Sequence, residues 1–416
     1  MRWISLMFLF FASFITYADK VVIGFAAEQL MREFSLNSSQ WGIVGSSFFL
    51  VYIITSLIGG TWSDRFGTTK IIFIVLAGVS IIQLGSFAII GLPMLIMYRV
   101  LLGAFEGPIV PTGLSHIAKI FPAEARGFAV SVFIAGASIG GIVCAPILVS
   151  LIANIGWKWT FVSLGFVSLI LLVIWALVNY FSQNRNNHTT IMTKKLKWSH
   201  IAPILRNPAC LLTITLSAAS YWLIIWVALW APVYLTKIMK LAPMKMAYLI
   251  SGTGIASIFL VFLISAISDR IFKKTQSYRR SRVFVSAIST IIGGLALAVI
   301  PLVGTSFQWI FVFLCLAKGA TYVNVSMATQ VMIKLMPERA GFMSSILTLG
   351  NNITQLVAPI VTGLLIQSAG GNLALGFNYS IYLMVGLFLL IAILNLIFVR
   401  PDDIKENTIS EKTVTF

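Results

Sequence analysis

The sequence predicts an all-α membrane protein in which twelve transmembrane helices form two pseudo-symmetric six-helix bundles. Of its 416 residues, 59% are hydrophobic and only 10% are charged, whereas charged residues make up about 25% of an ordinary soluble domain. Apolar runs of about 20 residues recur along the chain, and each is long enough to cross a hydrocarbon core of roughly 30 Å. Motifs that recur in the two halves indicate a duplicated helical unit.

Twelve apolar runs give the expected helices. They lie near 3–28, 40–60, 71–90, 94–114, 127–152, 160–181, 208–234, 246–267, 283–302, 308–333, 342–366 and 377–399. The first run could also be a secretory signal, but apolar sequence resumes after Lys20, so we expect a transmembrane helix there.

The polar stretch between the sixth and seventh runs sets the domain boundaries. We predict an N-terminal bundle at 1–181, a cytoplasmic linker at 182–207, a C-terminal bundle at 208–399 and a cytoplasmic tail at 400–416.

The basic residues alternate with these spans. Most of the 29 Lys and Arg lie at the N-terminus, in every second loop or in the tail. Because cytoplasmic loops carry an excess of Lys and Arg, both termini are predicted to be cytoplasmic. The formal net charge of +17 is then a topology signal, and we expect the lipid bilayer but no nucleic acid as a partner. The segments before the first span and after the last span are short, so we expect the protein in the cell (inner) membrane of a prokaryote.

A charged loop motif follows the second span and returns in degenerate form after the eighth. The first copy contains Gly60, Asp64, Arg65, Gly67 and Lys70, and the second contains Asp269 and Arg270. The first copy resembles the signature loop of the major facilitator superfamily. This resemblance implies that superfamily's fold and a conformational latch, in which Asp64 caps a helix N-terminus or pairs with a cation until the halves rock. The alternative is a plain charged turn.

Three further segments narrow the resemblance. They are Tyr17-Ala-Asp19-Lys20, Tyr98-Arg99-Val-Leu-Leu-Gly103-Ala-Phe-Glu106-Gly107-Pro108 and Trp230-Ala-Pro232-Val-Tyr234-Leu235. Together they resemble the anion:cation symporter family, which includes bacterial sugar-acid permeases and animal carriers of organic anions and phosphate. Members of that family often have Asp-Arg where this chain has Asp19-Lys20. Lysine keeps the charge but lacks the two-pronged guanidinium, so a carboxylate would be held there by a point contact.

Ionisable residues inside the apolar runs are the strongest candidates for a functional site. They are Asp19, Lys20, Arg99, Glu106 and Lys318. A charge at the centre of a membrane helix costs about 2.5–3.5 kcal/mol on insertion scales, so such residues usually face a cavity or mark a substrate pathway. We predict that Lys20 and Arg99 bind a carboxylate. The alternative is that Arg99 is permanently paired with Asp19 or Glu106 and holds two helices together.

Glu106 lies two helical turns after Arg99, on nearly the same helix face. A carboxyl group in that position can carry a proton, and the family resemblance implies that Glu106 and Asp19 form the proton-coupling pair. The alternative is a fixed ion pair that does not titrate during transport. Lys318 has no role in the family pattern. It could contact a second anionic group, replace a bound sodium ion, or pair locally.

Polar and aromatic residues in other spans complete the predicted site. We expect Tyr52, Asn351 and Asn352 to hydrogen-bond a hydroxylated substrate, and Trp226 to line the wall of its pocket. The amides and hydroxyls could instead bond one another across helices. The aromatic series around Trp226 could equally be lipid-facing packing.

The remaining motifs exclude other functional classes. Cys144, Cys210 and Cys315 show no paired spacing, so neither a disulfide framework nor a metal site is expected. The sequence lacks HExxH and nucleotide-loop motifs in register with a helix start, so we expect no enzyme, no cofactor and no primary pump. We predict a monomeric symporter that imports a small organic anion, such as a sugar acid or hydroxy acid, with protons, and sodium is the alternative coupling ion. The alternatives are a carrier of amino acids or other zwitterions, or an exporter of drugs or siderophores.

Overall fold

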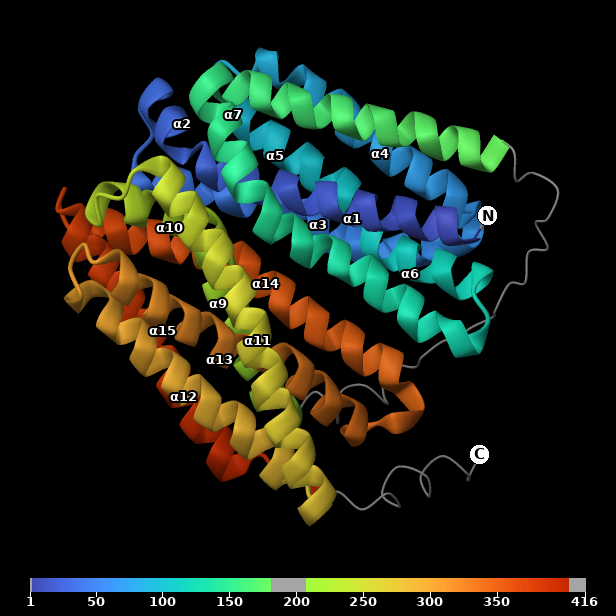
Figure 1. Cartoon of the computed structure of the whole chain (residues 1–416), viewed down its shortest axis with the longest axis vertical. Helices are drawn as coiled ribbons and strands as arrows, with labels where there is room; N and C mark the ends of the chain where they lie inside the picture. The colour runs from blue at the N-terminus through green and yellow to red at the C-terminus, as the bar shows by residue number, and fades with distance from the viewer. Residues whose placement is uncertain (1, 181–206, 404–416) are drawn as a thin grey trace. The chain divides into compact units, whose positions relative to one another are not determined.

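The computed structural model describes residues 2–180 and 207–403, and these are almost entirely helical (Figure 1). No β-strand occurs within those two ranges. The predicted linker, apart from Asn207, and the tail beyond Asp403 lie outside the described residues. The all-α fold class is therefore confirmed.

The described first half of the chain contains seven α-helices, of which α2 has only 7 residues and α6 only 12. They are α1 (Arg2–Phe25), α2 (Ala27–Glu33), α3 (Ser38–Phe66), α4 (Thr68–Leu84), α5 (Leu92–Glu106), α6 (Ile109–Ile120) and α7 (Ala123–Tyr180). Helix α1 packs along α7, and α3 packs along α5 (Figure 1). Both pairs belong to one compact unit, which therefore contains α1 and α5, the two helices that carry most of the charged candidates.

The second half has the same helical character. Its α-helices are α9 (Pro208–Leu229), α10 (Ala231–Val233), α11 (Pro243–Thr275), α12 (Phe284–Val299), α13 (Phe307–Leu335), α14 (Ala340–Ser368) and α15 (Leu373–Phe398). Short π-helical turns, η2 (Tyr234–Ile238) and η3 (Arg279–Val283), follow α10 and precede α12. Helices α12 and α13 lie side by side (Figure 1).

Eleven helices among the described residues are long and apolar enough to cross a membrane. One of them, the 58-residue α7, is broken at Gly156, where φ is 77° and ψ is 168°. This left-handed φ favours glycine because a side chain would clash with the backbone. Helix α7 therefore holds the predicted span 127–152 and the described part of the span 160–181. Each of the twelve apolar runs is largely helical where it is described.

The predicted span 94–114 differs from the structure because it is divided into α5 and α6 at Gly107 and Pro108. The backbones of α3 and α5 touch here. A Cβ added to Gly103 would lie 1.9 Å from the carbonyl oxygen of Phe48, and one added to Gly107 would lie 2.0 Å from the hydroxyl of Thr55. Only glycine fits at such distances. The contact brings the charged residues of α5 directly against α3.

Packing divides the described chain into two units. The first contains residues 2–180 with Ile225–Gly252 and Gln355–Phe377, and the second contains residues 207–224, Thr253–Thr354 and 378–403. Within the first unit, the hydroxyl of Ser251 donates a hydrogen bond to the carbonyl of Ile142 at 2.5 Å. Parts of α9, α11 and α14 thus belong to the same packed body as α1 to α7. The division into bundles at 1–181 and 208–399 stays a prediction, because these units reflect the packing of one conformation.

We predict that Gly103→Ala lowers the free energy of unfolding by about 1–3 kcal/mol, because the added methyl group overpacks the contact with α3. Gly60→Ala is the matched control, since a Cβ at Gly60 meets nothing within 4 Å. Denaturant titration of the solubilised protein measures both variants. Equal stability of the two variants would contradict the close contact between α3 and α5.

Candidate functional site

Four of the five predicted intramembrane charges lie in the first unit. Asp19 and Lys20 are on α1, and Arg99 and Glu106 are on α5. The side chains of Asp19 and Glu106 are 0% exposed, and Arg99 is 2% exposed. Lys20 is partly buried. Such burial is unusual for charged residues, which are rarely enclosed without a partner.

A chain of hydrogen bonds holds Asp19. The side-chain amide of Gln83 donates to Asp19 Oδ1 at 2.6 Å, and the hydroxyl of Tyr98 donates to the amide oxygen of Gln83 at 2.5 Å. The chain links α1, α4 and α5. Asp19 Oδ2 is buried and has no hydrogen-bond partner among the described residues. One oxygen of this carboxyl group is thus fixed while the other is unpartnered.

Lys20 and Arg99 are both held against aromatic rings of α3. The ammonium of Lys20 donates to the hydroxyl of Tyr52 at 3.2 Å and lies 4.4 Å from the centre of the Tyr52 ring. The guanidinium carbon of Arg99 lies 4.6 Å from the centre of the Phe48 ring, which itself stacks on Tyr52. Cation–π contacts of this kind stabilise a positive charge without neutralising it. Both cations therefore retain their capacity to bind an anion.

No ion pair within 4.0 Å joins the charged residues of this cluster in the part of the chain that the structure describes. Arg99 Nε and both carboxyl oxygens of Glu106 are buried and form no hydrogen bond with a described residue. The alternative in which Arg99 is tied to Asp19 or Glu106 by a fixed ion pair is therefore not the arrangement in this structure. Chemically, the cluster offers two cations for an anion and a carboxyl group that can take up a proton.

Two members of this cluster were missed by the sequence analysis. Gln83 is a lone amide within the apolar run 71–90, and its position inside a span was the available signal. Phe48 precedes Tyr52 by one helical turn, but nothing in the sequence indicates that a cation would lie over its ring.

Trp226 belongs to the first unit, where its side chain is 2% exposed. Its ring centre lies 5.7 Å from that of Tyr234, and its indole nitrogen has no hydrogen-bond partner in the described chain. This nitrogen is a buried donor within the first unit. A contact between Trp226 and a substrate stays a prediction.

The other predicted contacts, Asn351, Asn352 and Lys318, lie in the second unit. Both asparagines are buried, and the amide oxygen of Asn351 has no hydrogen-bond partner among the described residues. The buried Lys318 donates to the hydroxyl of Thr253 at 3.2 Å and has no acidic partner within 4.0 Å in the described ranges. The structure thus supports local pairing of Lys318 with Thr253, and its functional role stays open.

Comparison with known proteins identifies the family. The family model described as Major Facilitator Superfamily matches residues 9–348. The chain belongs to the major facilitator superfamily. Members of this superfamily are membrane transporters and not enzymes, which confirms the prediction that the protein is not an enzyme.

Full-length relatives support the narrower resemblance. The chain is 25% identical to the "Probable sulfoacetate transporter SauU" of Cupriavidus necator, covering 93% of this chain and 91% of the relative. It is 24% identical to the "Hexuronate transporter" of Bacillus subtilis, covering 95% and 94%. A bacterial homologue of the human lysosomal transporter Spinster, solved in an inward-facing conformation, matches with a TM-score of 0.78 at 17% identity, covering 96% and 97%. The sequence relatives confirm the predicted resemblance to transporters of sugar acids and other anions, and the solved structure confirms the fold.

The first copy of the superfamily's signature loop joins α3 to α4. Asp64 lies 3.5 Å from the ammonium of Lys119 and accepts a hydrogen bond from the hydroxyl of Ser115 at 3.4 Å, both on α6. Gly67 has φ 89°, which favours glycine at the turn. Gly60 is not crowded, since a Cβ there would meet nothing within 4 Å. The sequence indicated that Asp64 could pair with a cation but did not identify Lys119.

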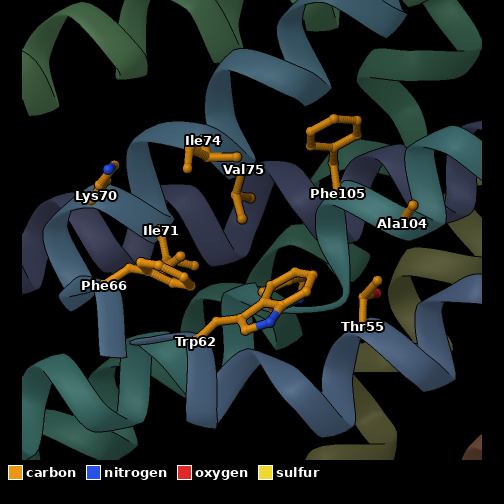
Figure 2. Close-up of a pocket in the computed structure, with 10 residues that line it drawn as sticks. Thr55, Trp62, Phe66, Lys70, Ile71, Ile74, Val75, Ala104 and Phe105 are labelled. Carbon is orange, nitrogen blue, oxygen red and sulfur yellow. The ribbon is translucent and has the colours of Figure 1, made fainter. Parts of the chain in front are cut away.

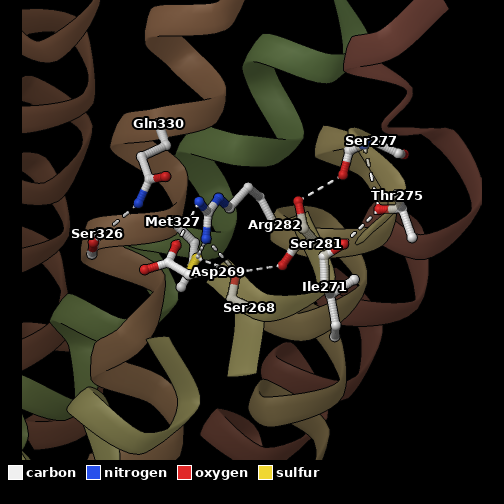
Figure 3. A network of polar contacts seen from close by, with 10 residues as sticks. All are labelled: Ser268, Asp269, Ile271, Thr275, Ser277, Ser281, Arg282, Ser326, Met327 and Gln330. Atoms are coloured by element: carbon white, nitrogen blue, oxygen red, sulfur yellow. Dashed lines mark hydrogen bonds and ion pairs between the residues drawn. The ribbon is translucent and has the colours of Figure 1, made fainter. Parts of the chain in front are cut away.

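The second copy lies at the end of α11 and has a tighter pairing (Figure 3). Asp269 lies 2.7 Å from the guanidinium of Arg282 in η3. Arg282 also donates to the hydroxyl of Ser268 at 2.6 Å, and that hydroxyl donates to the carbonyl of Ser281. Arg270 is exposed. Since Arg282 is buried, its bonds are better shielded from water than those of Asp64 (Figure 3).

We predict that Asp269→Asn lowers the free energy of unfolding by about 1–3 kcal/mol, because the buried Arg282 would lose its charged partner. Asp64→Asn should cost less than about 1 kcal/mol, since both Asp64 and Lys119 are exposed. The same denaturant titration compares the two variants. A larger loss for Asp64→Asn would contradict this ranking.

Proposed function

We propose that this major facilitator superfamily transporter is a proton-coupled symporter that imports a small organic anion by alternating access. The observation that carries the proposal is the buried cluster of Lys20, Arg99, Asp19 and Glu106, in which no cation is paired with a carboxylate. The proposed substrate is a sugar acid or a small hydroxy or carboxylic acid. The proposed location is the inner membrane, with both termini cytoplasmic.

The two cations support an anionic substrate. Lys20 and Arg99 are positioned by Tyr52 and Phe48 without losing their charge. A carboxylate placed between them would compensate two buried charges at once, which is a strong interaction where water is excluded. The relatives point the same way, because sulfoacetate and hexuronate are both anions. Asn351, Asn352 and Trp226 are proposed as further contacts with the rest of the substrate.

The two carboxyl groups support coupling to protons. An ionised carboxylate buried without a partner is expensive, so the fully buried Glu106 with two unpartnered oxygens is a plausible proton carrier. Asp19 is the second coupling residue, with Oδ1 held by Gln83 and Oδ2 available for a proton. A substrate anion arriving at Arg99 adds negative charge to the cluster and favours proton uptake. Substrate and proton would then cross the membrane together.

The signature-loop pairs supply the proposed conformational latch. The ion pairs Asp64–Lys119 and Asp269–Arg282 would break or re-form as the transporter changes state.

Sodium coupling is an alternative to proton coupling. A zwitterionic substrate is the second candidate, because an amino acid could use the unpartnered oxygen of Asp19 for its ammonium group and Arg99 for its carboxylate.

The test is transport by the purified protein in vesicles that enclose a pH-sensitive dye. Pools of sugar acids, simple mono- and dicarboxylic acids, and amino acids are added in turn. Acidification with an acid pool supports proton–anion symport, whereas a signal with amino acids alone supports the zwitterion carrier. Uptake that requires sodium and leaves the internal pH unchanged would overturn proton coupling.

We predict that Glu106→Gln abolishes uphill uptake driven by a pH gradient but leaves exchange of external for internal substrate largely intact. Glutamine preserves the shape of the side chain but cannot carry the proton, so only the coupled step is lost. Counterflow and gradient-driven uptake of the same labelled substrate measure the two activities. Accumulation at the wild-type level would exclude Glu106 as the coupling residue.

We predict that Arg99→Ala weakens substrate binding at least 100-fold, about 2.7 kcal/mol, because the counter-charge of the substrate carboxylate is removed. Arg32→Ala is the control, since Arg32 is an exposed arginine of the same unit and lies outside the signature loop. Binding is measured by calorimetry with the acid identified in the vesicle assay. Unchanged affinity of Arg99→Ala would remove this residue from the binding site.

A further inference from the structure

An apolar groove lies between α3, α4 and α5, next to the signature loop (Figure 2). It has a volume of about 460 Å³, within the roughly 300–1,000 Å³ of small-molecule sites. Trp62 and Phe66 from α3 and Ile74 from α4 form part of its wall and are 39%, 48% and 43% exposed. Phe105 and Pro108 line its inner side. The described chain therefore leaves a substantial part of this apolar wall uncovered.

The length of the groove matches one leaflet of a bilayer. Its lining runs along α3 from Phe66 to Thr55, eleven residues earlier. At 1.5 Å per residue this is about 16 Å, close to half of the roughly 30 Å hydrocarbon core. The Phe66 end adjoins the charged loop, which the distribution of basic residues predicts to be cytoplasmic. An acyl chain of the cytoplasmic leaflet would span the groove from the loop to the middle of the membrane.

Two cations without acidic partners lie at the loop end of the groove. Lys70 is one of the lining residues, is exposed, and forms no ion pair within 4.0 Å in the described chain. The guanidinium of Arg65 lies 5.3 Å from the ring centre of Phe66 and likewise has no acidic partner among the described residues. The neighbouring Asp64 is paired with Lys119. This end of the groove therefore carries positive charge and no acidic lining residue that would attract an ammonium headgroup.

We propose that the groove binds an acyl chain of an anionic phospholipid, whose phosphate is held by Lys70 and Arg65. Basic pockets between transmembrane helices on the cytoplasmic side are typical sites for anionic headgroups. The bound chain packs against Phe105 and Pro108, which flank Glu106 and Gly107 at the break between α5 and α6. The lipid thus contacts the residues on both sides of the helix break that follows Glu106.

Quenching of Trp62 fluorescence tests the proposal. The full-length protein is reconstituted with phosphatidylglycerol or phosphatidylcholine brominated on the acyl chains, at equal mole fractions. The difference between wild type and Trp62→Phe isolates the Trp62 signal. We expect brominated phosphatidylglycerol to quench that signal at least threefold more effectively than brominated phosphatidylcholine.

Three variants decide between specific binding and general contact with lipid. Lys70→Gln should remove the preference for phosphatidylglycerol, and Ala104→Phe should reduce quenching by both lipids because it fills the groove. Lys274→Gln is the control, since Lys274 is an exposed lysine at the end of α11 in the second unit. Equal quenching by the two lipids in wild type, or an unchanged preference in Lys70→Gln, would overturn the proposal. Weak quenching by both lipids together with a dimer in light scattering would instead assign the groove to a second copy of this chain.

Discussion

A charge inside a membrane must be compensated by nearby polar or charged groups. The core of the first unit depends on the contacts that compensate four charged side chains. Asp19, Lys20, Arg99 and Glu106 lie in one packed unit, but no ion pair within 4.0 Å joins them in the described part of the chain. Both carboxyl oxygens of Glu106 are buried without a hydrogen-bond partner among the described residues. A hydrogen bond from Gln83 holds Asp19, and aromatic rings of α3 contact Lys20 and Arg99. Such contacts orient a charge without cancelling it, so the cluster can respond to a substrate anion or a proton. If all four residues were paired in salt bridges, the cluster would have no charge free to bind a substrate anion or a proton.

This arrangement requires unusually close packing between helices. The missing side chain of Gly103 allows the backbone of α5 to touch that of α3, which places Arg99 over the ring of Phe48. The break at Gly107 and Pro108 follows directly after Glu106, so the carboxyl group lies at the end of a helix and not in its middle. Local changes in the break can therefore move Glu106 without unfolding a whole span. Phe105 and Pro108, which flank this break, also line the apolar groove.

Much of the fold was predictable because the bilayer limits what a chain can do. Only helices satisfy their own backbone hydrogen bonds in lipid, so runs of about 20 apolar residues identify the spans with little ambiguity. Charged residues within those runs are equally visible, since their cost makes chance occurrence rare. Asp19, Lys20, Arg99 and Glu106 were found in this way, and the structure brings them into one unit together with Tyr52, which was predicted as a polar contact. The signature loop was recognised because its residues resemble the motif of the superfamily.

The partners of these residues were not predictable, because they depend on contacts between distant segments. Gln83 meets Asp19 across 64 positions of the chain, and Lys119 and Arg282 are ordinary loop cations until the fold places them beside aspartates. The division of the fourth span was missed although Gly107 and Pro108 are visible in the sequence, since both residues are tolerated inside membrane helices. Whether Asn351, Asn352 and Lys318 reach the substrate depends on the arrangement of the two units, which the sequence pattern does not specify.

The most direct test of the unpaired cluster is the number of protons taken up when substrate binds. Calorimetric titration of the purified transporter in two buffers with different ionisation enthalpies gives this number without any membrane gradient. If the substrate anion engages Arg99 and favours protonation of the carboxyl cluster, about one proton should be taken up per substrate bound, and none in Glu106→Gln. Binding of the substrate with no proton uptake by the wild-type protein would contradict the central role of this cluster.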